Sequence, residues 1–339
     1  MRDLVVAGGG PVGLATALYA ARAGLDVVVW EPRRGVVDKA CGEGLMPGAV
    51  VALTDLGLRL DGHPIRGIRY LDGSRHAEAR FRHGDGQGVR RTTLHAALQD
   101  AVREAGVEVC ARRVESLSDR GDHLLVDGEP VRHLVAADGL HSPVRRMAGL
   151  DRPAVRRRRH GLRHHVAVAP WTSFVEVHWS PVGEAYVTPV GPAEVGVAVL
   201  TEEKRPLPAL LTAFPALASR LDGAPVTSTV RGAGPLRQRV RGRVAGRVLL
   251  VGDAAGYVDA LTGEGIAVSV AAARVLVECL VRDRPQDYEP AWRQVSRSYR
   301  LLTGSLLRAR RNRVLGPAVV PAAARLPWLF GRVVDQLAG

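Results

Sequence analysis

A glycine-rich turn directly after an apolar run is the part of this sequence best suited to binding. The turn Gly8–Gly13 has the sequence GGGPVG and follows the run Leu4–Ala7. In the spacing Gly-x-Gly-x-x-Gly, the backbone turns tightly, approaches a pyrophosphate and lets a helix pack closely on a strand. Glu31 ends the next apolar run and can accept a hydrogen bond from an adenosine ribose hydroxyl. The pattern predicts a bound dinucleotide. The contacting residues are expected to be Gly8, Gly10, Pro11, Val12, Gly13 and Glu31.

A second stretch of glycines and carboxylates lies far along the chain. Val248–Gly265 has the sequence VLLVGDAAGYVDALTGEG, and the helix-like run Ile266–Leu280 follows it. A carboxylate after a buried strand can hold a sugar or ribityl hydroxyl, while free amides at a helix start can face an electron-rich ring. Together with the first turn, this stretch predicts FAD. The expected contacts here are Gly252, Asp253, Gly263, Gly265 and Ile266.

Other positions are weaker candidates for cofactor contact. Arg91 begins a predicted helix, so its guanidinium can reach a phosphate while Leu94 and Leu98 pack inward; an ordinary solvated arginine is the alternative. An Asp-Gly pair after the predicted strand His133–Ala137 can contact the cofactor or simply form a turn. The candidates of this group are Arg33, Arg34, Arg91, Val114, Asp138 and Gly139.

Four residues are candidates for catalysis. Cys41 lies in the loop ACGEGLM and is either a reactive group or an inert small hydrophobe, and Glu43 in the same loop is a candidate proton donor. Alternation in VEVHW places Glu176 and His178 on one face of a strand, which covers the flavin or faces water. Tyr186 on the following strand has the same two interpretations. The catalytic candidates are Cys41, Glu43, His178 and Tyr186.

The elements that position these residues predict an α/β fold. Strands at 4–7, 27–30, 107–110, 133–137 and 247–251 alternate with helices at 11–23, 91–105 and 266–280, which is typical of a Rossmann-like FAD-binding domain. Short β-like runs between 160 and 200 predict an inserted, mostly antiparallel substrate domain, joined by a hairpin at 65–71 and 76–81. A single helix is expected at 207–221. We therefore expect a discontinuous cofactor domain of residues 1–60, 86–152 and 240–300, and a substrate domain of residues 61–85 and 153–239. Residues 301–339 are expected to form a C-terminal helical segment. This segment packs on the core, caps the substrate pocket or lies on a membrane.

The charge of the chain is strongly positive, at +13, and only Lys39 and Lys204 are lysines. A GC-rich coding sequence explains such arginine usage, and attraction of anions is the functional alternative: FAD, a nicotinamide dinucleotide phosphate, an acidic carrier protein or an anionic membrane surface. The aromatic content is 4% and the basic residues are dispersed, which argues against nucleic acid as a partner.

The cysteines and the apolar runs bear on the compartment. Three cysteines without metal-ligand spacing indicate a reduced protein with no metal site. Met1-Arg2-Asp3 leads directly into the first strand without an N-terminal signal peptide, and no apolar run reaches the roughly 18 residues of a membrane span. We expect a cytoplasmic protein, with peripheral membrane association as an option.

Together these motifs resemble the FAD-dependent oxidoreductase superfamily of aromatic-ring hydroxylases and geranylgeranyl reductases. The resemblance covers roughly residues 1–300 and rests on GGGPVG, Asp138-Gly139 and Gly252-Asp253. Lys39–Gly44, with the sequence KACGEG, and the TGEGI turn are similar to the reductase branch. Ala260 departs from both branches, and Glu43 stands where the reductases often carry glycine. The tryptophan pair typical of flavin halogenases is absent, which leaves halogenation a minor option.

The resemblance implies three functions. The leading hypothesis is a monooxygenase in which NADPH or NADH reduces FAD, O2 forms a C4a-hydroperoxyflavin, and one oxygen atom passes to a hydrophobic, secondary-metabolite substrate. The alternative is reduction of prenyl double bonds, with a proton from Cys41, Glu43 or a neighbour. A non-catalytic flavin-binding or electron-transfer protein is the third hypothesis.

Overall fold

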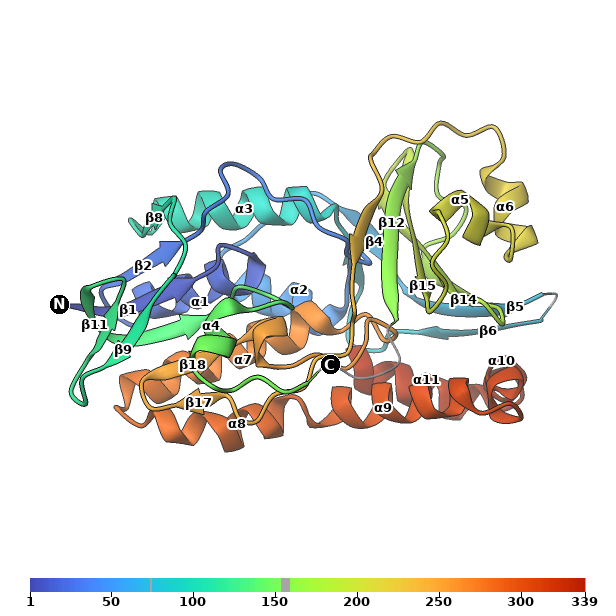
Figure 1. Ribbon diagram of the computed structural model, residues 1–339. Coiled ribbons are helices and arrows are strands. Elements are labelled where there is room, and N and C mark those ends of the chain that lie inside the picture. The colour runs from blue at the N-terminus through green and yellow to red at the C-terminus, as the bar shows by residue number, and fades with distance from the viewer. Residues whose placement is uncertain (74, 154–158, 339) are drawn as a thin grey trace.

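An eight-stranded and a seven-stranded β-sheet lie side by side, and C-terminal helices run beneath both in Figure 1. This computed structural model describes residues 1–73, 75–153 and 159–338. Residues 74, 154–158 and 339 belong to the predicted hairpin connection, the predicted substrate domain and the predicted C-terminal segment, and they lie outside the described residues. The α/β fold class expected from the sequence is confirmed.

Parallel strands of the larger sheet bring four strand ends to one edge. Val27–Trp30 is buried throughout, as central strands of a parallel sheet are. Ala7 lies opposite both Trp30 and Ala136, and Ala136 lies opposite Leu250. The residues that follow these strands therefore meet at the carboxyl edge, where open α/β sheets bind ligands. The sheet has the order β17 (Val244–Ala245), β18 (Val248–Leu250), β11 (Glu129–Ala136), β1 (Arg2–Ala7), β2 (Val27–Trp30) and β8 (Glu108–Cys110), and β9 (Leu117–Asp119) and β10 (Leu124–Val126) extend it beside β11.

The helices of this lobe form where the sequence predicts them. Helix α1 (Pro11–Arg22) packs against both α3 (Arg91–Glu104) and α7 (Gly265–Val281). Leu94 and Leu98 of α3 are buried, as their four-residue spacing predicts. The other helices of the lobe are α2 (Pro47–Asp55), α4 (Pro143–Met147) and α8 (Tyr288–Val295), with short 3-10 helices at Gly252–Ala255 and Pro285–Asp287.

The seven-stranded sheet contains the predicted hairpin. Strands β5 (Gly67–Asp72) and β6 (Arg75–Arg80) pair with each other, and β5 joins the sheet by parallel pairing with β13 (Phe174–Trp179). The expected helix at 207–221 is wrong in one respect: it is two helices, α5 (Leu207–Leu211) and α6 (Pro215–Leu221). Pro215 disfavours a helical conformation at Phe214, which breaks the run. The strand order is β16 (Arg231–Ala233), β12 (His160–Val166), β15 (Glu194–Thr201), β14 (Gly183–Gly191), β13 (Phe174–Trp179), β5 (Gly67–Asp72) and β6 (Arg75–Arg80).

A small three-stranded sheet, which the sequence analysis did not predict, holds the loop around residue 43. It consists of β3 (Gly44–Leu45), β7 (Gly86–Gly88) and β4 (His63–Ile65). Gly88 lies so close to β14 that a Cβ there would be 1.6 Å from the carbonyl oxygen of Pro189. The small sheet thus packs directly against the seven-stranded sheet.

Three C-terminal helices pack on one another, and the last two of them cover the β5–β6 hairpin. They are α9 (Arg297–Arg311), α10 (Leu315–Arg325) and α11 (Pro327–Ala338), and Val320, Phe330 and Val334 pack into one apolar cluster with Tyr70. The sequence analysis considered three alternatives for the C-terminal segment. Packing on the core is confirmed for the side of the segment that carries Val320, Phe330 and Val334. A buried ion cluster also anchors it, since Glu184 of β14 pairs with Arg159 and with Arg310 of α9.

Glu184→Ala is expected to destabilise the protein by about 3 kcal/mol, because two guanidinium groups would lose their buried partner. Thermal or urea unfolding measures the loss. The control is Glu203→Ala, which breaks an exposed ion pair with Arg205 and is expected to cost less than about 1 kcal/mol. Equal effects of the two substitutions would contradict the anchoring role of Glu184.

Candidate active site

The first glycine turn has the geometry of a phosphate-binding loop. Gly8 has φ +107°, and a Cβ there would lie 2.5 Å from the carbonyl oxygen of Ala137. A Cβ on Gly13 would lie 1.9 Å from the carbonyl oxygen of Gly8. A Cβ on Gly10 would meet no atom within 4 Å, so this glycine borders open space. No side chain caps α1, so its first-turn amides, next to Pro11 and Val12, are available to an anion.

Cationic side chains gather around this end of α1. Burial lowers the pKa of Lys39, and the positive charge of Arg33 lowers it further. Arg91 is buried, and burial lowers its pKa as well. Its Nη1 atom has no hydrogen-bond partner within the described residues. An unpaired buried guanidinium nitrogen is costly, and a phosphate oxygen would satisfy it.

Glu31 lies at the carboxyl end of β2, as predicted, and is already hydrogen-bonded. Its carboxylate accepts from the Gly9 amide at 2.8 Å and from Arg33 Nε at 2.7 Å. Burial opposes ionisation, but these hydrogen bonds hold the pKa of Glu31 below its usual value. A ribose hydroxyl would share the carboxylate with Arg33. Of the other predicted contacts, Arg34 is exposed and Val114 is buried in the core of the parallel sheet.

His95 joins the glycine turn to the next loop, and the sequence analysis missed it. Its Nδ1 accepts the Val37 amide at 3.2 Å, so Nε2 carries the proton that it donates to the Gly9 carbonyl at 2.7 Å. Burial lowers its pKa. This neutral imidazole holds the Gly9 backbone in place through the hydrogen bond to its carbonyl. A single histidine on a helix has no sequence pattern that would predict this role.

The Asp138-Gly139 pair begins a loop that is tied to the second glycine stretch. Asp138 Oδ2 accepts from the Val144 amide at 3.1 Å and so caps α4, while its Oδ1 is buried without a partner. Gly139 has φ +85°. Arg145 donates to the carbonyls of Leu140 and Ala254, which joins this loop to the 3-10 helix after β18. The sequence analysis did not single out Arg145.

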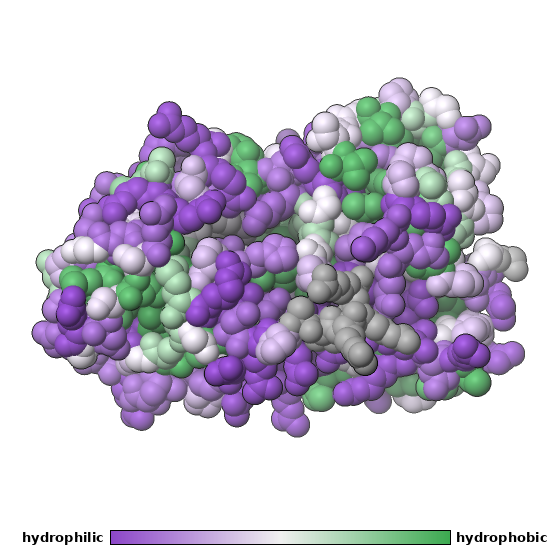
Figure 2. Space-filling view, viewed as in Figure 1, coloured by the Kyte–Doolittle hydropathy of each residue, from purple (hydrophilic) through white to green (hydrophobic). Residues whose placement is uncertain are grey.

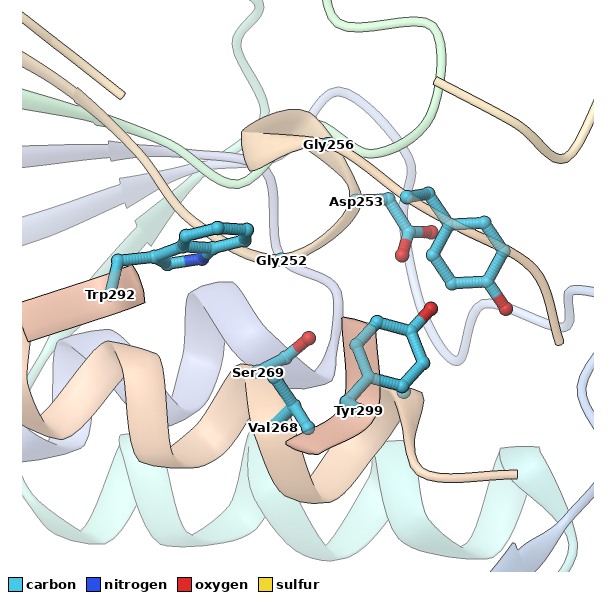
Figure 3. Close-up of a pocket in the computed structure, with 9 residues that line it drawn as sticks. Gly252, Asp253, Gly256, Val268, Ser269, Trp292 and Tyr299 are labelled. Atoms are coloured by element: carbon cyan, nitrogen blue, oxygen red, sulfur yellow. The ribbon is translucent and has the colours of Figure 1, made fainter. Parts of the chain in front are cut away.

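Asp253 follows β18 next to the first glycine turn, since a Cβ on the preceding Gly252 would lie 3.4 Å from the Val12 side chain. Its carboxylate is exposed there, yet the surrounding protein raises its pKa against the attraction of Lys39, Arg91 and Arg145. A cavity of about 20 Å³ beside it, lined by Ser269, Trp292 and Tyr299 among others, holds no more than one water molecule (Figure 3). A dinucleotide would therefore have to lie outside this cavity.

The second helix start lies beside Asp253, at the same small cavity, and has no cap. Gly263 is exposed with φ +75°, and α7 begins at Gly265 with no side chain capping its first turn, which includes Ile266. Glu264 is buried beside them with an unpartnered Oε2, and burial raises its pKa to about 8. The sequence analysis included the amides of this turn but not the Glu264 carboxyl group.

Cys41 and Glu43 occupy a rigid loop between the two lobes. Glu43 has φ +59° and is buried, and its amide donates to Cys41 Sγ at 3.4 Å. One carboxylate oxygen of Glu43 accepts from the Arg91 amide at 2.8 Å. Burial raises the pKa of the partly exposed Cys41 thiol, and the charge of Glu43 adds to the rise. The thiol therefore stays protonated.

A buried histidine holds the other oxygen of Glu43. His165 Nε2 lies 2.6 Å from Glu43 Oε2, and its Nδ1 lies 2.8 Å from Ser228 Oγ. Arg90 and Arg163 also approach Nδ1, and because arginine only donates, Nδ1 must accept and Nε2 must donate to Glu43. His165 and Ser228 are far from Glu43 in sequence, so no local pattern predicts this network.

His178 is a correction to the sequence analysis. In the β13–β14 pair, Tyr186 lies opposite Val177 and His178 lies opposite Ala185, so the tyrosine and the histidine project from opposite faces of the sheet. His178 contacts Glu176 on the far face, where α5 and α6 pack. Tyr186 projects towards the site, and its hydroxyl donates to the Leu261 carbonyl at 2.7 Å.

A dinucleotide has a pyrophosphate and a ring that require hydrogen-bond donors. The candidate site offers such donors at the carboxyl edge of the sheet, at two uncapped helix starts and at the unpaired Nη1 of Arg91. A Rossmann-like lobe joined to an antiparallel sheet is the arrangement of FAD-dependent oxidoreductases. The protein belongs to this class.

Comparisons with known proteins agree. A family model described as an FAD binding domain matches residues 1–282. Menaquinone reductase of Mycolicibacterium smegmatis is 31% identical, with 86% of this chain and 79% of that protein covered. Digeranylgeranylglycerophospholipid reductase 1 of Methanopyrus kandleri is 31% identical, with 84% and 82% covered. The crystal structure of p-nitrophenol 4-monooxygenase from Pseudomonas putida shares the fold, with a TM-score of 0.82, 20% identity and 100% and 98% coverage. The chain belongs to the FAD-dependent oxidoreductase superfamily of aromatic-ring hydroxylases and geranylgeranyl reductases.

Arg91→Met is expected to weaken FAD binding by about tenfold to a hundredfold, because the phosphate would lose a charged hydrogen-bond donor. Fluorescence titration with FAD measures the affinity. The control Arg103→Met removes an exposed arginine from the same helix and should leave the affinity unchanged. Equal affinities of the two variants would refute the phosphate contact.

Glu264→Gln is expected to reduce the loss of stability at high pH. The pKa of Glu264 rises from 4.5 to about 8 in the folded protein, so the folded state binds this proton more tightly and loses stability as the pH rises through that window. Thermal unfolding between about pH 6 and about pH 9 should show a smaller decrease for the variant than for the wild type. Glu104→Gln, at an exposed position, is the control. Identical pH profiles of Glu264→Gln and wild type would rule out a buried neutral carboxyl group.

Proposed function

We propose that this chain reduces isolated carbon–carbon double bonds in the prenyl chain of a hydrophobic small molecule. Two relatives with about 31% identity support this proposal, and their names specify a menaquinone and a digeranylgeranylglycerophospholipid as the molecules reduced. Likeness to monooxygenases is confined to the fold, because the identity is 20%.

The partly exposed thiol of Cys41, which contacts the Glu43 amide, carries the proposal. Reduction of an unactivated alkene needs a hydride on one carbon and a proton on the other, and a protonated thiol is a group that can donate this proton. Bound FAD, reduced by NADPH or NADH, would supply the hydride. Cys41 would supply the proton, after which two new C–H bonds replace the π bond.

The neighbours of Cys41 suit the task of proton donation. After the proton leaves, the nearby guanidinium of Arg91 would stabilise the thiolate, since its charge lowers the pKa of Cys41. The Glu43 amide orients Sγ, and the contacts of Glu43 with Arg91 and His165 hold this amide in place. We assign Glu43 and His165 as positioning residues, and water would return the proton to the thiolate.

Oxygen-dependent hydroxylation, the leading hypothesis of the sequence analysis, is the second candidate, favoured by the shared fold. The two functions differ in their co-substrate and in product mass. Without oxygen, NADPH-reduced protein incubated with a prenylated quinone or a geranylgeranyl lipid should give a product heavier by two hydrogen atoms per double bond. Product that forms only with O2 and carries added oxygen would instead establish the monooxygenase. No product under either condition would favour the third hypothesis, a non-catalytic flavoprotein.

Cys41→Ala is expected to lower the anaerobic turnover rate by about a hundredfold or more while FAD stays bound, because the substitution removes the proton donor. Single-turnover oxidation of the reduced flavin by the alkene measures the step. Cys110→Ala, at the outer strand β8, is the matched control and should keep the full rate. A full rate in Cys41→Ala would remove the thiol from the mechanism.

A further inference from the structure

Exposed large apolar side chains recur on the C-terminal helices, among exposed arginines. Among the described residues, fourteen large apolar side chains are exposed, and five of them lie between residues 314 and 329. Val314 is 77% exposed and Trp328 is 58% exposed. We call this set the tail ridge: Val314, Leu315, Leu326, Trp328 and Leu329. Figure 2 shows a few separate hydrophobic residues among hydrophilic ones along the lower right edge, where α10 lies in Figure 1.

The ridge continues along one helix. Leu315 and Leu326 mark the two ends of α10, about 16 Å apart for a helix of this length. Pro317, Ala318 and Ala322 are exposed between them, and the exposed Arg325 lies in the last turn of the helix. The opposite face of α10 packs inward through Val320.

The corner that presents Val314 and Leu315 is rigid. Asn312 Oδ1 accepts the amides of both residues, at 2.9 and 3.0 Å. A Cβ on Gly316 would lie 2.7 Å from the Arg310 carbonyl oxygen, so the turn between α9 and α10 is tightly packed. The two apolar side chains therefore cannot fold back into the core.

Unpaired arginines surround the ridge. The 45 residues from Pro290 to Val334 contain nine arginines and no aspartate or glutamate. Arg310 and Arg311 pair with Glu184 and Glu202 of the neighbouring lobe. Six others are exposed and have no carboxylate partner in the part of the chain that the structure describes, and four of these six follow residue 307: Arg308, Arg313, Arg325 and Arg332.

We propose that the tail ridge docks the protein on an anionic lipid bilayer. Apolar tips flanked by arginines match an interface in which acyl chains lie beneath negatively charged headgroups. In a symmetric dimer formed through this surface, arginines would face arginines, so a second copy is a poor match. No helix in the described residues is long and apolar enough to cross a membrane, so the contact is a surface one. This inference is independent of the reaction proposed above.

Sedimentation with lipid vesicles tests the proposal without any substrate. The wild-type protein should sediment with phosphatidylglycerol vesicles but not with phosphatidylcholine vesicles, and high salt should release it because the arginine contribution is screened. The double variant Trp328→Ser/Leu329→Ser should bind anionic vesicles at least about tenfold more weakly, since it loses apolar contact area. Val51→Ser on α2, where Val51 is 56% exposed, is the matched control and should bind like the wild type.

Fluorescence gives a second measurement at the ridge itself. Trp328 is the exposed tryptophan, so its emission should shift to shorter wavelength on anionic vesicles, and Trp328→Phe should abolish this shift. Wild-type protein that stays in the supernatant would overturn the proposal. So would equal binding by the folded double variant, or a vesicle-free dimer that the double substitution converts to a monomer.

Discussion

Ala7 of β1 lies opposite Trp30 of β2 and Ala136 of β11, and Ala136 lies opposite Leu250 of β18. This register depends on buried apolar side chains, since a shift of one residue would turn every side chain to the other face of the sheet. Because the strands are parallel and aligned, Gly8, Glu31, Asp138 and Asp253 all follow at one edge. Everything that the candidate site offers to a cofactor depends on that alignment.

The same alignment places polar groups where the protein itself does not complete their hydrogen bonds. Arg91 Nη1, Asp138 Oδ1 and Glu264 Oε2 are buried without partners, and two helix starts lack caps. Each such group costs free energy unless a ligand completes its hydrogen bonds. These groups lie after the carboxyl end of β11 and at the starts of α3 and α7, which gives a physical reason for a bound anion and ring there.

Local patterns predicted the elements well because their causes are local. The apolar runs before Gly8 and Gly252 could only be buried strands, and the glycine spacing required a close turn after β1. Patterns could not decide which face of β13 meets the site, because alternation separates the two faces without orienting them. His178 was therefore placed wrongly. The contact of Glu43 with His165 joins residues 122 positions apart, and Gly86–Gly88 lacks any strand pattern, so neither His165 nor the small sheet was foreseeable.

The central claim is that the aligned strand ends form one FAD site. Titration of the purified protein with FAD, followed by desalting and an absorbance spectrum, tests it most directly. The account predicts a yellow protein that keeps about one FAD per chain, as a single dinucleotide fold would. A protein that is colourless on purification, stays colourless after incubation with excess FAD and shows no measurable affinity for FAD would contradict it.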